Sequence, residues 1–358
     1  MKNVKTIYWC LLGLLLLVGS ACNKAPELTP NTTDFATLEK QVLTDFTNNV
    51  ALNNYLKLSV SASNLNMALQ NLNNNTTDSN LVVARASWQT LRETWEQSEG
   101  FLFGPVEDND YDPNMDTWPT DYVQLDSLLA SNNNLMASDI QNITLSLRGF
   151  HPIEYIIFGN HGNKKASAIT AREKQYMVSL SEDITNTCTA LYLSWSSAPI
   201  NYAQEVLNSG NVGEKYASKK EVYNAMVSAL IDIAGEVADS KMKEPYDTKN
   251  PQLVESPYSG NSLTDFKNNI IGLQNVYLGT NGGKGLKDLV AVNNKALDNK
   301  IQSQITTAIN SIRNISGFYE EAIITQRVQI QQSMQALATL KSTLEEELLP
   351  FINQNVKD

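Results

Sequence analysis

Apolar residues recur every three or four positions along most of the chain, the spacing that places side chains on one face of an α-helix. Near the beginning, Leu38, Val42, Phe46 and Val50 follow this spacing. The clearest pattern predicts a helix over 170–197. Further helices are predicted over 122–148 with interruptions, and over 217–242, 262–278, 294–316 and 318–348, the last ending near Pro350. Because the sequence has no series of short alternating strands bounded by turn residues, it predicts an all-α fold.

Two proline-rich segments interrupt the helical pattern, at 104–121 and at 243–261. Neither can be a continuous helix, because proline lacks the backbone N–H and its ring clashes with the preceding turn. Between them, the sequence SSAPI at 196–200 indicates a boundary. We therefore expect two helical bundles in tandem, over 34–197 and over 198–358.

The first residues have the order of a secretory signal. Lys2 and Lys5 supply a short positive segment, an apolar run follows over 7–18, and small residues lead to Cys22. The run is shorter than the roughly 20 residues that a transmembrane helix needs. The small residues ending at the cysteine resemble a lipobox. The alternative is an ordinary signal peptide with an incidental cysteine.

We therefore expect a signal peptide over 1–21, a lipid anchor on Cys22 and a polar tether over 22–33. Lipid chains of this kind would hold the protein at the cell envelope, on a bacterial membrane facing the periplasm or the cell exterior. Apart from Cys22, the expected mature chain keeps only Cys188, so no disulfide within the chain is predicted. Cys188 lies in an apolar helical stretch and is expected in the core.

The net charge of the chain limits the classes of molecule that it can bind. The formal net charge is −11, and it becomes −13 for the expected mature chain because the signal contains two lysines and no acid. A nucleic-acid-binding protein needs stripes of Lys and Arg, so this class is excluded. An acidic protein attracts cations.

Histidine is scarce, and one of the two histidines is placed for metal chemistry. His151 and Glu154 are three residues apart, so on a helix they project to the same side. An imidazole and a carboxylate together can ligate a metal ion. The alternative is a helix-start histidine with a surface glutamate nearby. His161 lies in a Gly/Asn/Lys turn and is expected to be exposed and without a role.

A second candidate ligand lies upstream. Glu99 shares a helix face with Trp95 and Leu102, and a carboxylate that points toward a core is costly unless it is paired or bound to metal. The alternative is a frayed helix end. Glu96, four residues after Arg92, is expected to form an exposed ion pair with it.

Two loops contain further candidate oxygen ligands for a metal ion. Asp116 lies beside Trp118 in an acidic loop that lacks the pattern of an EF-hand. In the second half, Glu255 and Ser259 precede a helix for which Ser262 is the expected N-cap, with Asp265 at the third helical position. A nucleophilic serine needs a histidine base, and no local sequence supplies one, so helix capping explains these serines better.

Three blocks of sequence carry a resemblance to a known family. GFHPIEYIIFG (149–159) resembles the GxHxxE signature of the imelysin family, also called the M75 peptidases. The segments WEQSEGFLFGPV (95–106) and DTWPTD (116–121) are similar to that family's first-domain pattern, and 244–279 is similar to its second-domain pattern. The blocks keep their order and span nearly the whole expected mature chain.

The resemblance implies two helical bundles with a site near their junction, an envelope location, and an association with iron uptake that involves an envelope partner. It implies a bound metal ion, iron in the first place and zinc as the alternative. The metal ligands that it implies are His151, Glu154, Glu99 and Asp116, with Glu96 competing for the role of Glu99. Glu255 and Ser259 match the second-domain motif.

One residue departs from the pattern that a cation site would favour. Pro152 fixes a helix start next to His151, and the partial positive charge of a helix N-terminus does not help to bind a cation. The other acids must therefore outweigh it. If they do not converge, the site would bind an anion or no ligand.

Three functions remain open at this stage. The first is a binding protein that captures an iron-like cation and hands it over, since carboxylate oxygens with one imidazole suit iron. The second in our ranking is an interaction or scaffold protein without a working metal site. The third is a metallopeptidase of the M75 type, in which a metal-bound water attacks a peptide carbonyl; its weakness is that the motif supplies only one histidine.

Overall fold

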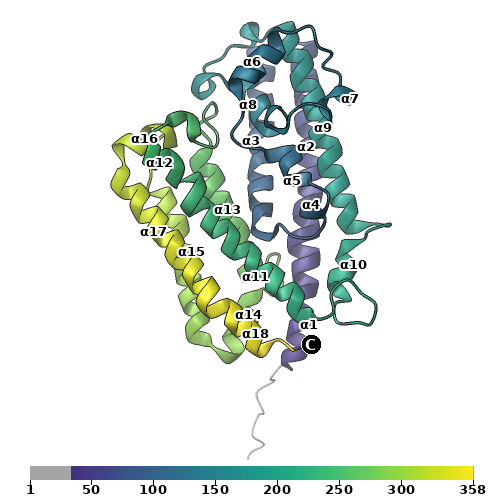
Figure 1. Cartoon of the computed structure of the whole chain (residues 1–358), viewed down its shortest axis with the longest axis vertical. Helices are drawn as coiled ribbons and strands as arrows, with labels where there is room; N and C mark the ends of the chain where they lie inside the picture. Colours follow the sequence, from purple (N-terminus) through teal and green to yellow (C-terminus); the bar gives the residue numbers. More distant parts are fainter. Residues whose placement is uncertain (1–33, 358) are drawn as a thin grey trace, which may run out of the picture. The chain divides into compact units, whose positions relative to one another are not determined.

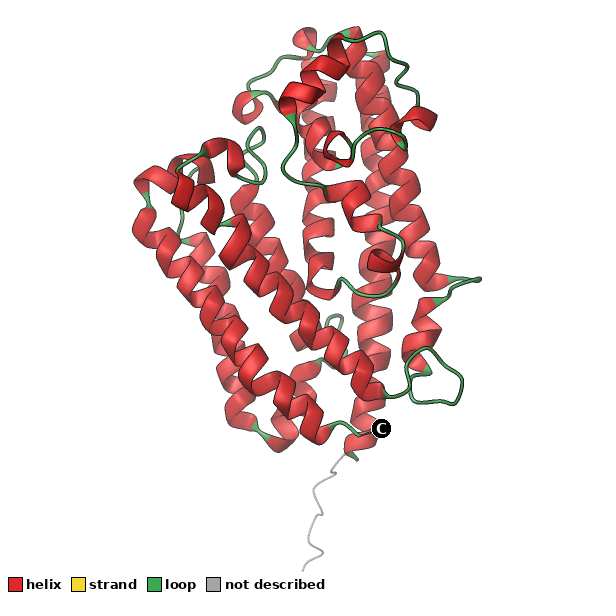
Figure 2. Ribbon diagram, in the orientation of Figure 1, coloured by secondary structure: helices red, strands yellow, loops and turns green. Residues whose placement is uncertain are grey.

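The computed structural model describes residues 34–357, and in this part of the chain every regular element is helical (Figure 2). This confirms the predicted all-α class. No helix among these residues is both long enough and apolar enough to cross a membrane. The predicted signal peptide over 1–21, the lipidation of Cys22 and the tether over 22–33 lie outside the described residues.

The first half of the chain begins with three segments that follow one another without a break and continues with one long helix, several short turns and a second long helix. In chain order the elements are α1 (Phe35–Asp45), η1 (Phe46–Leu52), α2 (Asn53–Asn74), α3 (Asp78–Ser98), η2 (Glu99–Phe101), α4 (Pro105–Asp108), α5 (Tyr111–Asp116), α6 (Tyr122–Ala130), α7 (Ala137–Ile140), η3 (Leu145–Leu147), α8 (Phe150–Phe158), η4 (Asn160–Gly162), η5 (Ala166–Ala168) and α9 (Ala171–Ser196).

The second half repeats this mixture of long helices and short turns. Its elements are α10 (Tyr202–Leu207), α11 (Lys219–Glu236), η6 (Val237–Lys241), α12 (Lys243–Thr248), η7 (Pro251–Leu253), α13 (Ser262–Leu278), α14 (Leu286–Asn293), α15 (Lys295–Arg313), α16 (Tyr319–Thr325), α17 (Arg327–Thr343), η8 (Leu344–Leu348) and α18 (Leu349–Asn355).

Helix bounds agree with the periodicity where capping residues mark the ends. The helix predicted over 170–197 is α9, and its N-terminus is closed by Thr170 and Glu173, which each accept a hydrogen bond from the other's backbone N–H. The end predicted near Pro350 is wrong, because α18 continues to Asn355. Pro350 is tolerated there because it lies in the first turn of α18, directly after the π-helical turn η8.

Long helices from both halves pack on one another (Figure 1). In the first half α2 packs against α3 and α9; in the second half α17 packs against α11 and α15, and α13 packs against α3 and η2. Residues 34–357 belong to one compact unit, and the boundary proposed near residue 198 remains a prediction.

Two glycines allow α13 to approach the end of α3 closely. A Cβ on Gly100 would lie 2.6 Å from the carbonyl carbon of Gly272, and a Cβ on Gly272 would overlap the carbonyl oxygen of Gln97. The atoms in the way are backbone atoms, which do not move aside as a flexible side chain does. The close contact therefore depends on glycine at both positions, and it sets the distance between the segments that carry the site.

We expect Gly272→Ala to lower the free energy of unfolding by about 2 kcal/mol or more, because the added methyl group forces α13 away from α3. Gly235→Ala is the matched control: Gly235 lies in a helix, but its nearest neighbour would be the flexible Lys341 side chain. This variant should be neutral, or more stable by up to about 1 kcal/mol, because alanine favours helix. Urea unfolding measures both, and equal effects would contradict this account of Gly272.

Candidate metal centre

Helix α8 brings the two motif residues to the interior. It begins after Gly149, whose φ of 78° and close approach to the Met115 carbonyl both require glycine. His151 and Glu154 then lie in its first turns, and both are buried. The alternative of a surface glutamate is therefore wrong for Glu154.

Asp116, the last residue of α5, is the meeting point of three side chains. Its Oδ1 accepts a hydrogen bond of 2.5 Å from Arg92, and its Oδ2 accepts one of 2.6 Å from the Trp95 indole. His151 Nε2 lies 2.9 Å from Oδ1. Burial would raise the pKa of Asp116, but the charge of Arg92 and the His151 side chain outweigh burial and hold that pKa well below its usual range. Asp116 is therefore an anion at neutral pH.

His151 lies between two carboxylates. Its Nε2 faces Asp116, and its Nδ1 lies 3.6 Å from Glu154 Oε2. Neither ring nitrogen has a partner with the alignment of a hydrogen bond, so both contacts are ion pairs. Burial works against the charged ring, but the two carboxylates outweigh it and raise the pKa of His151 to about 9. Without a metal ion, the ring is an imidazolium at neutral pH.

Glu154 divides its two oxygens between the halves of the chain. Its Oε1 accepts three hydrogen bonds from the second half, from Tyr258 N at 3.1 Å, Ser259 N at 2.7 Å and Ser259 Oγ at 2.7 Å. Its Oε2 faces His151 and has no hydrogen-bond partner. Ser259, which the sequence assigned only to the second-domain motif, thus lies beside Glu154 and holds it as a hydrogen-bond donor.

Arg92 is at the centre of the buried charges. One guanidinium nitrogen contacts both Glu96 and Glu255, at 3.0 Å from the latter, and Nε lies 3.9 Å from Asp265. The expectation of an exposed Arg92–Glu96 pair is wrong, since both side chains are fully buried. The reason is that α13 packs on this face of α3, a contact that the pattern of α3 alone does not indicate.

Glu99 is buried, as expected from its apolar helix face, but its contacts differ from those of His151. It accepts hydrogen bonds from Lys241 Nζ at 2.9 Å and from Asn269. No hydrogen bond or ion pair between described residues joins it to His151 or to Glu154. Burial, followed by the nearby charge of Glu96, raises the pKa of Glu99 well above its usual value. Glu99 thus belongs to the Lys241 end of the charge cluster.

Three carboxylates converge closely enough to share one cation. Glu96, Asp116 and Glu255 each offer an oxygen, and these oxygens lie within 4.8 Å of one another. From the sequence, Glu96 is only an alternative to Glu99 as a metal ligand. The spacing does indicate that Glu96 is buried: Arg92 follows Trp88 by four residues and Glu96 follows Arg92 by four, so both charged residues share a helix face with a tryptophan.

A cavity of about 220 Å³ lies beside these carboxylates. Three residues of the predicted site line it, namely Glu99, Asp116 and Glu255, together with Leu102, Asp112, Trp118, Pro119, Glu236, Ser240, Lys241, Glu244 and Leu253. Its wall therefore contains six carboxylates and a single lysine. Burial, then the charge of Asp116, raises the pKa of Asp112 to about 7.

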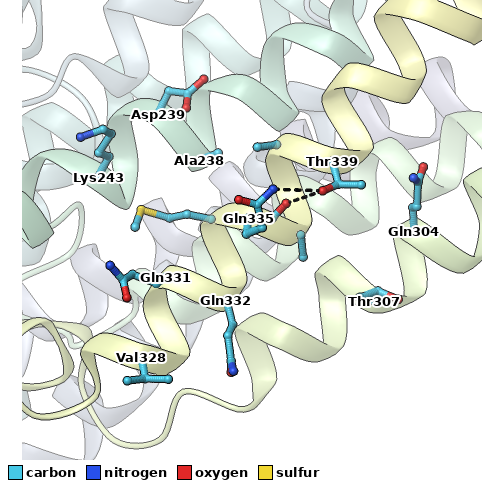
Figure 3. A pocket seen from close by; sticks show the side chains of 13 residues that line it. Ala238, Asp239, Lys243, Gln304, Thr307, Val328, Gln331, Gln332, Gln335 and Thr339 are labelled. Atoms are coloured by element: carbon cyan, nitrogen blue, oxygen red, sulfur yellow. Dashed lines mark hydrogen bonds between the residues drawn. The ribbon is translucent and has the colours of Figure 1, made fainter.

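A larger groove of about 760 Å³ runs along α17 and has a different chemistry (Figure 3). Glutamines, alanines and threonines dominate its wall, and Asp239 is the only carboxylate among its lining residues. A cation-binding function therefore points to the smaller cavity.

The Imelysin family model, peptidase family M75, matches residues 51–346, which include every residue of the buried charge cluster and of the cavity beside it. This chain belongs to the imelysin family. The resemblance carried by the GxHxxE block is thereby confirmed.

Relatives of this imelysin cover nearly its whole length. It is 28% identical over 341 residues to iron-regulated protein A of Synechococcus elongatus, covering 93% of this chain and 90% of the relative. A crystal structure of a candidate iron-regulated protein A precursor from Parabacteroides distasonis matches with a TM-score of 0.80 at 23% identity, covering 89% of this chain and 95% of the other. An imelysin-like protein from Psychrobacter arcticum matches at 0.67 and 14%, covering 89% and 96%. The two structures support the fold.

Two smaller expectations about this imelysin are wrong. Ser262 does not cap α13; it is the first helical residue, and its Oγ accepts a hydrogen bond of 2.9 Å from Ser256 N. His161 is half-buried, lies 3.0 Å from Glu320, and stacks on Phe318. The partners of His161 lie more than 150 residues away along the chain, so the local sequence does not show them.

The stability of the metal-free protein should fall as the pH rises from about 5 to about 9. Burial raises the pKa of Glu255 to about 7, with Lys241 opposing the shift, and the pKa of His151 is about 9. Both groups hold their protons more tightly in the folded state, so their stabilising contributions are lost as the pH rises through these values.

Urea unfolding with a chelator should give a free energy of unfolding lower by about 1 kcal/mol or more at about pH 9 than at about pH 6. In His151→Gln the decline above about pH 7 should be smaller; an unchanged decline would contradict the assignment to His151.

Proposed function

We propose that this imelysin binds one hard metal cation, iron in the first place, at the carboxylates of Glu96, Asp116 and Glu255. The observation that carries the proposal is the excess of buried carboxyl groups over cations. Six carboxyl groups belong to the cluster, and Arg92, Lys241 and the imidazolium of His151 oppose them, so the formal excess is three negative charges when every carboxyl is ionised. The six are those of Glu96, Glu99, Asp116, Glu154, Glu255 and Asp265. Burial and repulsion raise the pKa values of Glu99, Glu255 and Asp265, and a bound cation would let these groups ionise.

The donor set fits such an ion. Glu255 Oε2 is buried, has no hydrogen-bond partner and belongs to a residue that lines the cavity. Carboxylate oxygens suit a hard cation such as iron, and zinc is the alternative. His151 lies outside the three residues that could share the ion, but its Nε2 contacts Asp116. The charge of the ion would favour the neutral ring, so binding should release protons and strengthen as the pH rises. Arg92 holds the carboxylates in place, since it contacts all three.

The name of one relative supports iron as the first choice. That relative, from Synechococcus elongatus, is named iron-regulated protein A. The proposed mechanism is capture and hand-over to an envelope partner, with no bond made or broken in a substrate. A cavity that opens beside the carboxylates would admit the ion without unfolding of the bundle.

Titration with ferrous iron under anaerobic conditions should reveal one binding site. Glu255→Gln removes one charge and one ligand oxygen with little change in shape, and should weaken binding at least about tenfold, the low end of what the loss of a supporting metal contact costs. Glu244→Gln is the matched control, because Glu244 lines the same cavity but lies outside the three-carboxylate cluster. It should change the affinity by no more than about threefold.

Two results would count against this proposal. Equal weakening by both variants would mean that the cavity attracts cations only through its total charge. No binding by the wild-type protein would favour the scaffold function instead.

We also propose that the protein is anchored at the cell envelope by a lipid on Cys22. The support is the order of charge, apolar run and small residues before that cysteine. Mass spectrometry of the protein extracted from membranes should show an N-terminus at acylated Cys22, and Cys22→Ser should move the protein into the soluble fraction. A variant that stays on the membrane would contradict the lipid anchor.

A further inference from the structure

Lys241 holds an unusual place among the buried charges. Its Nζ lies 2.9 Å from Glu99 Oε2 and 3.0 Å from Glu255 Oε1. It also lies 3.5 Å from Glu96 Oε2 and 3.7 Å from Glu236 Oε1. One ammonium group is thus surrounded by four carboxylates, and two of these, Glu96 and Glu255, belong to the cluster proposed for the metal ion.

The other buried cation of the cluster differs in its freedom to move. Arg92 is fully enclosed, is bound on several sides, and lies 5.1 Å from the centre of the Phe150 ring. Lys241 lines the cavity, and its side chain is 11% exposed. A lysine is a compact charge on a flexible four-carbon stem. Lys241 can therefore leave the carboxylates where Arg92 cannot.

The structure offers the ammonium group another position. Glu236 is 47% exposed and already lies 3.7 Å from Nζ. A swing of the lysine toward Glu236 would remove its positive charge from beside Glu96 and Glu255 while keeping the ammonium paired. Glu255 Oε2, a buried carboxylate atom without a hydrogen-bond partner, belongs to one of the residues that the lysine would leave.

We propose that Lys241 is a built-in competitor of the metal ion: its ammonium group occupies the carboxylates in the metal-free state and moves outward when a cation binds. This inference rests on the proposed function. An ammonium and a metal ion cannot share oxygens of Glu96 and Glu255 without strong repulsion. The lysine therefore limits the affinity, and its return speeds the release of the ion.

The test compares Lys241→Gln with the wild-type protein in the anaerobic ferrous iron titration. The variant should bind at least about tenfold more tightly, because the mobile ammonium group no longer competes for Glu96 and Glu255. Lys243→Gln is the matched control: it removes the same charge two residues away, from an exposed pair with Asp247, and should change the affinity by no more than about threefold. Unchanged or weaker binding by Lys241→Gln would overturn the inference.

A second measurement uses the wild-type protein and so does not depend on the folding of a variant. Acylation of lysine amines, followed by mass spectrometry of the peptides, reports how accessible each lysine is. Ferrous iron should raise the rate of labelling of Lys241 and leave that of Lys243 unchanged. A rate for Lys241 that stays the same or falls would overturn the inference.

The titration separates this inference from the proposed function. Binding by the wild-type protein with no gain in Lys241→Gln would keep the function and remove the competitor. Binding by Lys241→Gln alone would support the competitor and remove the function for the native chain. No binding by either protein would remove both.

Discussion

The buried guanidinium of Arg92 is the interaction on which the rest of the structure depends. A charge that is removed from water must be paired, because an unpaired buried ion costs several kcal/mol. Arg92 meets this requirement with carboxylates from four segments: Glu96 on its own helix, Asp116 at the end of α5, Glu255 in the loop before α13, and Asp265 in α13. Each pairing brings one segment to α3, so the two halves of the chain meet around one side chain.

The charges around Arg92 are better explained by ligand binding than by stability. Replacing a buried ion pair with apolar residues of similar volume is often neutral or stabilising, so a fold gains little from keeping six buried carboxylates. Burial, and then repulsion by Glu96, raises the pKa values of Glu99 and Asp265 well above normal. A group of acids that resists ionisation is relieved by a cation, which supplies a functional reason for it.

The sequence predicted the helices and part of the site. The contacts that it did not predict share one physical cause, which is that they join segments far apart along the chain. The ends of α13 follow from periodicity, and the start of α9 follows from periodicity and capping, both of which are local. The pairing of His151 with Glu154 is also local, because it follows from helix geometry. The burial of Glu96, the contact of Glu255 with Arg92 and the partner of Glu99 depend on α13 and η6, more than 130 residues away along the chain. The sequence of α3 alone does not indicate which helix packs against it.

The signature GxHxxE acquires a structural meaning from these contacts. Its glycine lets the chain pass Met115 closely, its histidine contacts Asp116, and its glutamate gives one oxygen to three donors of the Tyr258–Ser259 segment. That segment follows Glu255 by only three residues, so a shift of Glu154 would also shift a carboxylate of the cluster. The glutamate therefore acts on the site mainly by fixing the second half of the chain, while its other oxygen remains free to face His151. In this arrangement one short motif positions acids from both halves, and neither half alone contains the complete cluster.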